Sequence, residues 1–113
     1  MDERQKDSNA EVVVVITTFP NREKARQIGT QLVELQLAAC VNLVSRVESI
    51  YAWKGKVEQE EEVIGLIKTT EEKRALLEAW MGDHHPYEVP ELIALPLKWG
   101  ARDYLDWVRS SLE

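Results

Sequence analysis

Apolar residues first form one continuous run and then recur at the spacing of a helix. Residues 11–18 are mostly β-branched, and an apolar run of this length is typical of a central strand buried on both faces. Beyond Pro20, apolar residues recur three or four positions apart across residues 25–35, with polar residues between them. This spacing predicts an amphipathic helix, which Asn21 is placed to cap and which ends near Gln36.

The next segment returns to a strand pattern that predicts a long antiparallel hairpin. Residues 37–53 form its first strand, with a bend or bulge expected at Ser45-Arg46. Lys54-Gly55 is a turn signal, and residues 57–69 run back as the second strand. A hairpin this long exposes a strand edge that a partner would cover, which favours symmetric self-association. A flexible projecting arm is the alternative.

The last third of the chain predicts a helix, a short strand and another helix. Thr69 and Glu72 have the spacing of a capping box, and Gly82 is the expected end of that helix. A short strand follows at residues 91–97, and a final helix starts after Gly100. The order βαβ-βαβ predicts an α+β, ferredoxin-like antiparallel sheet with helices on one face, an extended β-hairpin and a C-terminal helix.

Composition narrows the class of protein further. The chain has 113 residues, which fits one domain over residues 11–113, and the polar residues 1–10 are predicted to be a disordered leader. The net charge of −6, with basic residues scattered among acids, argues against nucleic acid as a partner. The single cysteine, Cys40, and the absence of a long apolar run predict a cytoplasmic protein that does not span a membrane.

Six segments of the chain form a recognisable pattern: Leu37-Ala-Ala-Cys-Val-Asn42, Ser49-Ile-Tyr-Ala-Trp-Lys-Gly-Lys56, Ile67-Lys-Thr69, His85-Pro-Tyr-Glu-Val-Pro-Glu91, Leu95-Pro96 and Tyr104-Leu-Asp-Trp107. In register from about residue 12 to residue 112, they closely resemble the CutA family, the divalent-cation-tolerance proteins. The resemblance implies a ferredoxin-like subunit in an interlocked homotrimer, similar in architecture to the PII signalling proteins. It also implies a cytoplasmic protein linked to copper and other divalent cations, without an established reaction. Ser45-Arg46 departs from the Pro-Gly usual in the family.

His84 and His85 are the predicted metal ligands, because imidazole suits copper, nickel and zinc. The resemblance implies a copper site made of matching histidines and a first-strand cysteine, but Ile16 stands at that position here. Pro86 favours an extended backbone at His85, so the two side chains are expected to point apart. One hypothesis is a weak site completed by Glu88 or by a neighbouring subunit; the other is a surface His84 and a structural His85.

A second predicted site combines aromatic and charged residues, namely Tyr51, Trp53, Lys68, Tyr87 and Glu88. The resemblance places several of them near the clefts between subunits, where a small anionic ligand would use Lys68 as its counter-charge. Alternatively, Lys68 pairs with a glutamate and the aromatic residues pack the trimer interface.

Two further features have alternative readings. Cys40 is either a soft metal ligand or a small buried apolar residue. The acidic run at residues 58–62 either collects hard cations or keeps a strand edge solvated. The sequence contains no phosphate loop, nucleophile elbow or paired-cysteine zinc motif, so we expect no enzyme. Three functions follow: a copper-binding tolerance protein, a PII-like small-molecule sensor, or a structural scaffold that binds partners.

Overall fold

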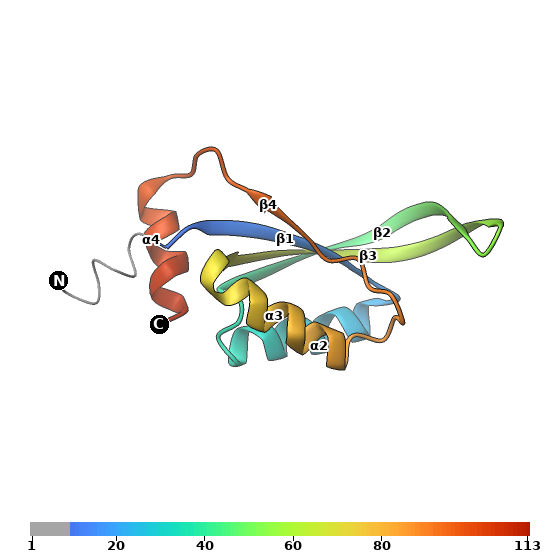
Figure 1. Cartoon of the computed structure of the whole chain (residues 1–113), viewed down its shortest axis with the longest axis horizontal. Helices are drawn as coiled ribbons and strands as arrows, with labels where there is room; N and C mark the ends of the chain where they lie inside the picture. The colour runs from blue at the N-terminus through green and yellow to red at the C-terminus, as the bar shows by residue number, and fades with distance from the viewer. Residues whose placement is uncertain (1–9) are drawn as a thin grey trace.

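The computed structural model describes residues 10–113, which form a four-stranded antiparallel sheet and three helices (Figure 1). The strand order is β2-β3-β1-β4, so the predicted ferredoxin-like arrangement is confirmed. Apart from Ala10, the predicted leader at residues 1–10 lies outside the described residues. The elements are β1 (Val12–Phe19), α2 (Arg22–Glu34), β2 (Cys40–Trp53), β3 (Lys56–Thr70), α3 (Glu71–His84), β4 (Ile93–Pro96) and α4 (Arg102–Ser111).

The main hydrophobic core lies between the sheet and the helices α2 and α3. Alternate residues of β1 point into it because successive side chains on a strand face opposite sides. The C-terminal helix α4 packs at the other end of the sheet, where Val108 and Leu112 contact Val12 and Ala39. The main core contains Val13, Val15, Phe19, Leu32, Ile67, Leu77 and Met81, each at most 3% exposed.

The helix boundaries follow local capping, with two departures from the sequence prediction. Asn21 caps α2 as predicted, since its Oδ1 accepts a 2.8 Å hydrogen bond from the Lys24 N–H. The cap of α3 is Thr70 rather than Thr69, because Thr69 is buried and its hydroxyl donates to the Leu37 carbonyl. Gly82 does not end α3, which continues to His84.

The reason lies in the residues that follow. Among the described glycines, only Gly55 has a positive φ, so Gly82 does not adopt the left-handed conformation of a helix-ending glycine. The helix ends at the extended residue His85, which precedes Pro86, and a residue before proline is biased away from the helical region.

The β2–β3 hairpin is the longest feature of the fold. Its turn is at Lys54-Gly55, both with positive φ, and the register shifts between Val44 and Val47 with Arg46 at φ 62°. The predicted turn and bulge are therefore confirmed. Pairing of β3 with β1 ends at Val63, so the distal half of the hairpin extends beyond the body of the domain (Figure 1). As a result the longest dimension reaches 55 Å.

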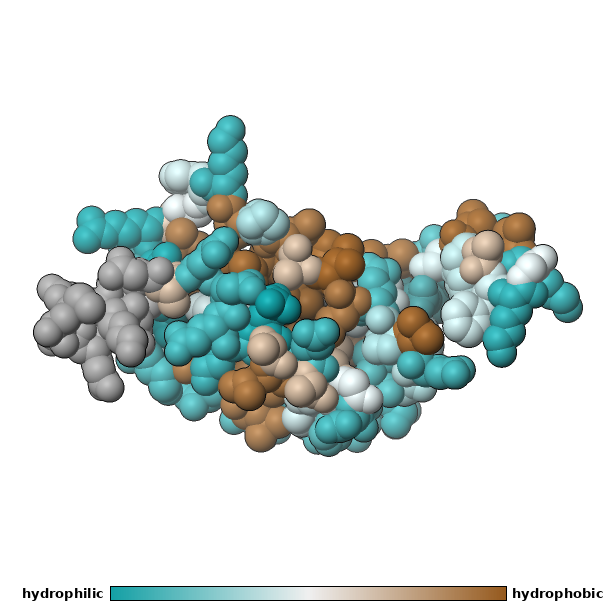
Figure 2. All heavy atoms as spheres, in the orientation of Figure 1, coloured by the Kyte–Doolittle hydropathy of each residue, from teal (hydrophilic) through white to brown (hydrophobic). Residues whose placement is uncertain are grey.

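The sheet face opposite α2 and α3 is apolar and largely uncovered. Val14 pairs with Leu95 and Ile16 pairs with Ile93, so these residues share that face. Ile93 and Leu95 are 51% and 46% exposed, as is Val44 (46%) on the edge strand β2. Figure 2 shows apolar side chains gathered over the central part of the molecule. We call this surface the open face.

Candidate functional site

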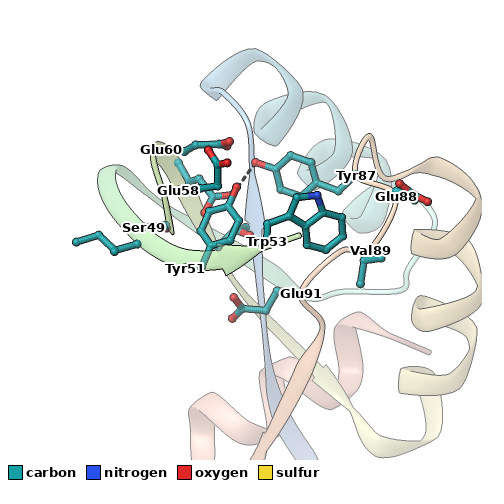
Figure 3. A pocket seen from close by; sticks show the side chains of 12 residues that line it. Ser49, Tyr51, Trp53, Glu58, Glu60, Tyr87, Glu88, Val89 and Glu91 are labelled. Carbon is teal, nitrogen blue, oxygen red and sulfur yellow. Dashed lines mark hydrogen bonds between the residues drawn. The ribbon is translucent and has the colours of Figure 1, made fainter. Parts of the chain in front are cut away.

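A pocket of about 780 Å³ lies where the hairpin meets the segment that follows α3. Tyr51 and Trp53 reach it from β2, because alternate residues of a strand share a face. Tyr87 enters from the opposite side, just after Pro86. In Figure 3 the three aromatic rings lie in the middle, with the labelled glutamates around them. The pocket therefore has aromatic side chains from two segments that are far apart in the sequence.

The charged residues lining the pocket are all acidic. Glu58, Glu60 and Glu62 alternate along β3, and Glu88 and Glu91 come from the segment after α3. Of the residues described by the structure, no lysine, arginine or histidine lines it. The ion pairs found within residues 10–113 use other carboxylates. The pocket accordingly has a negative potential that attracts cations and repels anions.

The pocket is anchored by a short hydrogen bond between Tyr87 and Glu62. The Tyr87 hydroxyl donates to Glu62 Oε2 at 2.6 Å, and Glu62 is only 8% exposed. Burial, and then this hydrogen bond, raise the pKa of Tyr87 well above its ordinary value. Tyr87 consequently remains a donor at neutral pH. Hydrogen bonding with Glu60 likewise raises the pKa of Tyr51.

His85 is a buried structural residue whose two ring nitrogens are both engaged. Its Nδ1 accepts a 3.0 Å bond from the Tyr87 N–H, so Nε2 carries the proton and donates to the Thr18 carbonyl at 2.8 Å. The ring also stacks on Phe19, with 5.3 Å between ring centroids. Burial lowers the pKa of His85 and keeps it neutral. A metal could bind this ring only after one of these bonds is broken.

His84 is exposed, and its ring contacts a different residue from those around His85. Its Nδ1–H donates to the Trp80 carbonyl at 2.8 Å, and its ring stacks on Trp80 at 4.1 Å. Within residues 10–113, no hydrogen bond involves its Nε2. The two predicted ligands thus hydrogen-bond to different segments, His84 to α3 and His85 to β1, and Ile16 lies on the apolar open face.

The same range contains no group of three His, Cys, Asp or Glu side chains placed to hold a metal ion. The residues of one chain therefore do not fit a three-ligand copper site.

Lys68 is the one residue of the predicted cleft set that does not line the pocket. It lies opposite Cys40 in the strand register, hydrogen-bonds Asn42 Oδ1, and places Nζ 3.9 Å from Cys40 Sγ. Within residues 10–113 of one chain it forms no ion pair with a glutamate, and it does not line the pocket with the aromatic residues. Tyr51, Trp53, Tyr87 and Glu88 all line the pocket within one chain. The sequence interpretation did not include Glu91.

The comparisons with known proteins agree with the fold and with the resemblance seen in the sequence. The model of the family described as "CutA1 divalent ion tolerance protein" matches residues 13–111. The chain belongs to this family. It is 47% identical over 98 residues to the divalent-cation tolerance protein CutA of Thermus thermophilus, a match covering 87% of this chain and 95% of that protein. It is 45% identical over 102 residues to protein CutA of Homo sapiens, covering 90% and 57% respectively.

Solved CutA1 structures have the same architecture. The divalent cation tolerance protein from Thermus thermophilus superposes with a TM-score of 0.87 at 45% identity, over 90% of this chain and 99% of that one. CutA1 from Oryza sativa gives 0.90 at 39% identity, over 94% and 97%. These likenesses confirm the α+β, ferredoxin-like fold. Within residues 10–113, no helix is both long and apolar enough to cross a membrane.

Proposed function

We propose that this CutA-family chain acts in the cytoplasm as a homotrimer that contributes to divalent-cation tolerance, with copper foremost and without catalysing a reaction. The open face is the observation that supports the proposed trimer. Val44, Ile93 and Leu95 are apolar and about half exposed there, on the two edge strands of the described sheet. Unpaired strand edges beside apolar surface are stabilised when symmetric copies cover them.

Light scattering tests this assembly. We expect a mass three times that of the 13.0 kDa chain at micromolar concentration. Ile93→Glu should lower the mass, because it places a charge on the apolar surface that the copies would cover. Leu76→Glu is the matched control, since Leu76 is 59% exposed on α3, away from that face. A monomeric wild-type protein would reject the proposal.

We expect His84 to bind copper weakly, as an ion that is taken up and released rather than as a resident cofactor. Its Nε2 is the imidazole nitrogen left outside the hydrogen bonds described above, whereas both nitrogens of His85 are engaged. Other ligands come from a neighbouring copy, because one chain does not complete a site. Calorimetric titration of copper into the metal-free protein tests this. We expect His84→Ala to abolish binding, and unchanged binding in the His84→Ala/His85→Ala double variant would overturn the assignment.

The acidic pocket favours a second function, the recognition of a small molecule. Its volume lies in the range typical of ligand sites, about 300–1,000 Å³. A small anion is disfavoured in the pocket itself, because five glutamates line it and Lys68 lies elsewhere. An anionic ligand would have to bind at a cleft between subunits that includes Lys68. Thermal-shift screening against nucleotides and carboxylates tests this, with stabilisation lost in Lys68→Ala as the expected result.

A further inference from the structure

We propose that the acidic aromatic pocket between the hairpin and the segment after α3 binds a linear aliphatic polyamine. This function goes beyond metal tolerance, and it uses neither His84 nor His85. Three observations carry it, namely the uncompensated charge in the pocket, its aromatic rings and its size.

The negative charge of the pocket favours a cationic ligand. Five carboxylates line one pocket, and no basic side chain of the described residues lines it with them. Glu62 is the most informative of the five, because its side chain is only 8% exposed and, among the described residues, accepts a side-chain hydrogen bond only from the Tyr87 hydroxyl. A buried carboxylate without a cationic partner carries a desolvation penalty. A bound ammonium group would offset that penalty by supplying the missing positive charge.

The aromatic residues indicate an organic cation. Ammonium and alkylammonium groups are attracted to the faces of tryptophan and tyrosine rings, and the methylene groups between them pack on the same rings. Trp53 shows this preference within the chain, since Lys54 Nζ lies 5.8 Å from its ring centroid. Tyr51 and Tyr87 provide two more rings inside the pocket (Figure 3).

The size and the arrangement of the carboxylates distinguish a polyamine from a metal ion. Ca²⁺ and Mg²⁺ require several oxygen atoms converging at about 2.0–2.6 Å from one point. Residues 10–113 offer no such group of three ligands, and a volume of about 780 Å³ far exceeds that of an ion. The glutamates instead surround the rings from several sides (Figure 3). Separated carboxylates suit an extended ligand with several amino groups.

Calorimetry on the full chain, with spermine as the probe, tests the proposal. We expect saturable binding with one site per chain, weakened by salt because it depends on charge. Putrescine and Mg²⁺ provide a comparison at equal charge. The proposal expects putrescine to bind more tightly than Mg²⁺, because only the diamine gains contact with the aromatic rings. Equal affinity for the two dications would overturn it, since general electrostatic attraction would then explain the binding.

Two glutamate variants locate the site. Glu58→Gln should weaken spermine binding about fivefold or more, as expected for the loss of one charged contact. Glu61→Gln is the matched control, because it removes the same charge from the same strand but lies on the opposite face of the hairpin. Its effect should stay below about twofold. Equal losses in both variants would contradict the assignment.

A third variant and the mass of the assembly complete the test. Trp53→Leu should weaken binding of spermine while leaving the weak Mg²⁺ attraction unchanged. Light scattering on the same variants separates ligand binding from assembly. If Glu58→Gln dissociates the oligomer without changing spermine affinity, the pocket is occupied by a neighbouring copy, and the proposal is wrong.

Discussion

Replacing each of the two adjacent histidines by alanine should have very different effects on stability. His85 is buried and bonded through both ring nitrogens, whereas His84 is exposed on the last turn of α3. His85→Ala leaves the Thr18 carbonyl and the Tyr87 N–H without their partner and removes the ring stacked on Phe19. His84→Ala removes one exposed hydrogen bond and one surface stacking contact.

The magnitude follows from these contacts. Each neutral hydrogen bond contributes about 0.5–1.5 kcal/mol, and an aromatic pair adds about 0.5–1.5 kcal/mol beyond its burial. We therefore expect His85→Ala to lower the free energy of unfolding by about 2–4 kcal/mol. For His84→Ala the expected loss is below about 1 kcal/mol, because exposed contacts are exchanged for contacts with water.

Urea unfolding of both variants at matched protein concentration, followed by tryptophan fluorescence, measures this difference. Similar small losses in the two variants would refute the structural role of His85. A loss of copper binding in His85→Ala should also be judged against its stability, since partial unfolding would mimic a missing ligand.

The pH dependence gives an independent check on the same residue. Burial lowers the folded-state pKa of His85 below its ordinary value of 6.5, so the unfolded chain binds the proton more readily. The contribution of the neutral ring is therefore fully present above pH 6.5 and is lost as the pH falls through the lower folded-state pKa. The stability difference between wild type and His85→Ala should shrink over that window. A pH-independent difference would contradict the burial argument.

The remaining predictions concern the pocket, the centre of the sheet and helix α3. Tyr87→Phe should cost about 1.5–3 kcal/mol at neutral pH, because Glu62 loses its charge-assisted hydrogen bond, and urea unfolding measures the loss. The folded-state pKa of Tyr87 is raised above 10.0, so its contribution to stability is fully present below pH 10.0 and is lost as the pH rises through the folded-state pKa. Above pH 10.0, the free energy of unfolding should therefore fall less with pH in the variant than in the wild type. Gly65→Ala should cost about 1–3 kcal/mol, because the new Cβ would lie 2.8 Å from the Phe19 ring. Gly82→Ala, in open space on α3, should instead stabilise by about 0.5–1 kcal/mol, and the opposite order in thermal melts would contradict both assignments.

The sequence predicted those features that local chemistry determines. Asn21 at the start of α2 and Lys54-Gly55 at the hairpin turn act through their own backbone, so they could be recognised without knowledge of the fold. The predicted end of α3 at Gly82 is wrong, because a glycine ends a helix only when the residues after it leave the helical conformation.

The candidate site was only partly predictable, because it depends on strand register and on long-range packing. Lys68 was grouped with the aromatic residues, yet the register places it opposite Cys40, far along β3 from the pocket. Tyr87 pairs with Glu62 across 25 positions of sequence, a contact that no local pattern encodes. The alternating glutamates on β3 were visible as an acidic run, but their role as a pocket wall required the segment after α3 to pack beside them.

The register shift between Val44 and Val47 inverts the rule that decides which side of β2 a residue faces. Before it, even-numbered residues such as Val44 share a face with Ile64; after it, odd-numbered residues such as Val47 share that same face with Glu62. If the same sequence paired without this extra residue, Arg46 would lie opposite Glu62 and every distal residue of β2 would turn to the other face. Tyr51 and Trp53 would then leave the pocket. One extra residue thus decides which side chains the distal half of β2 presents on each face of the hairpin.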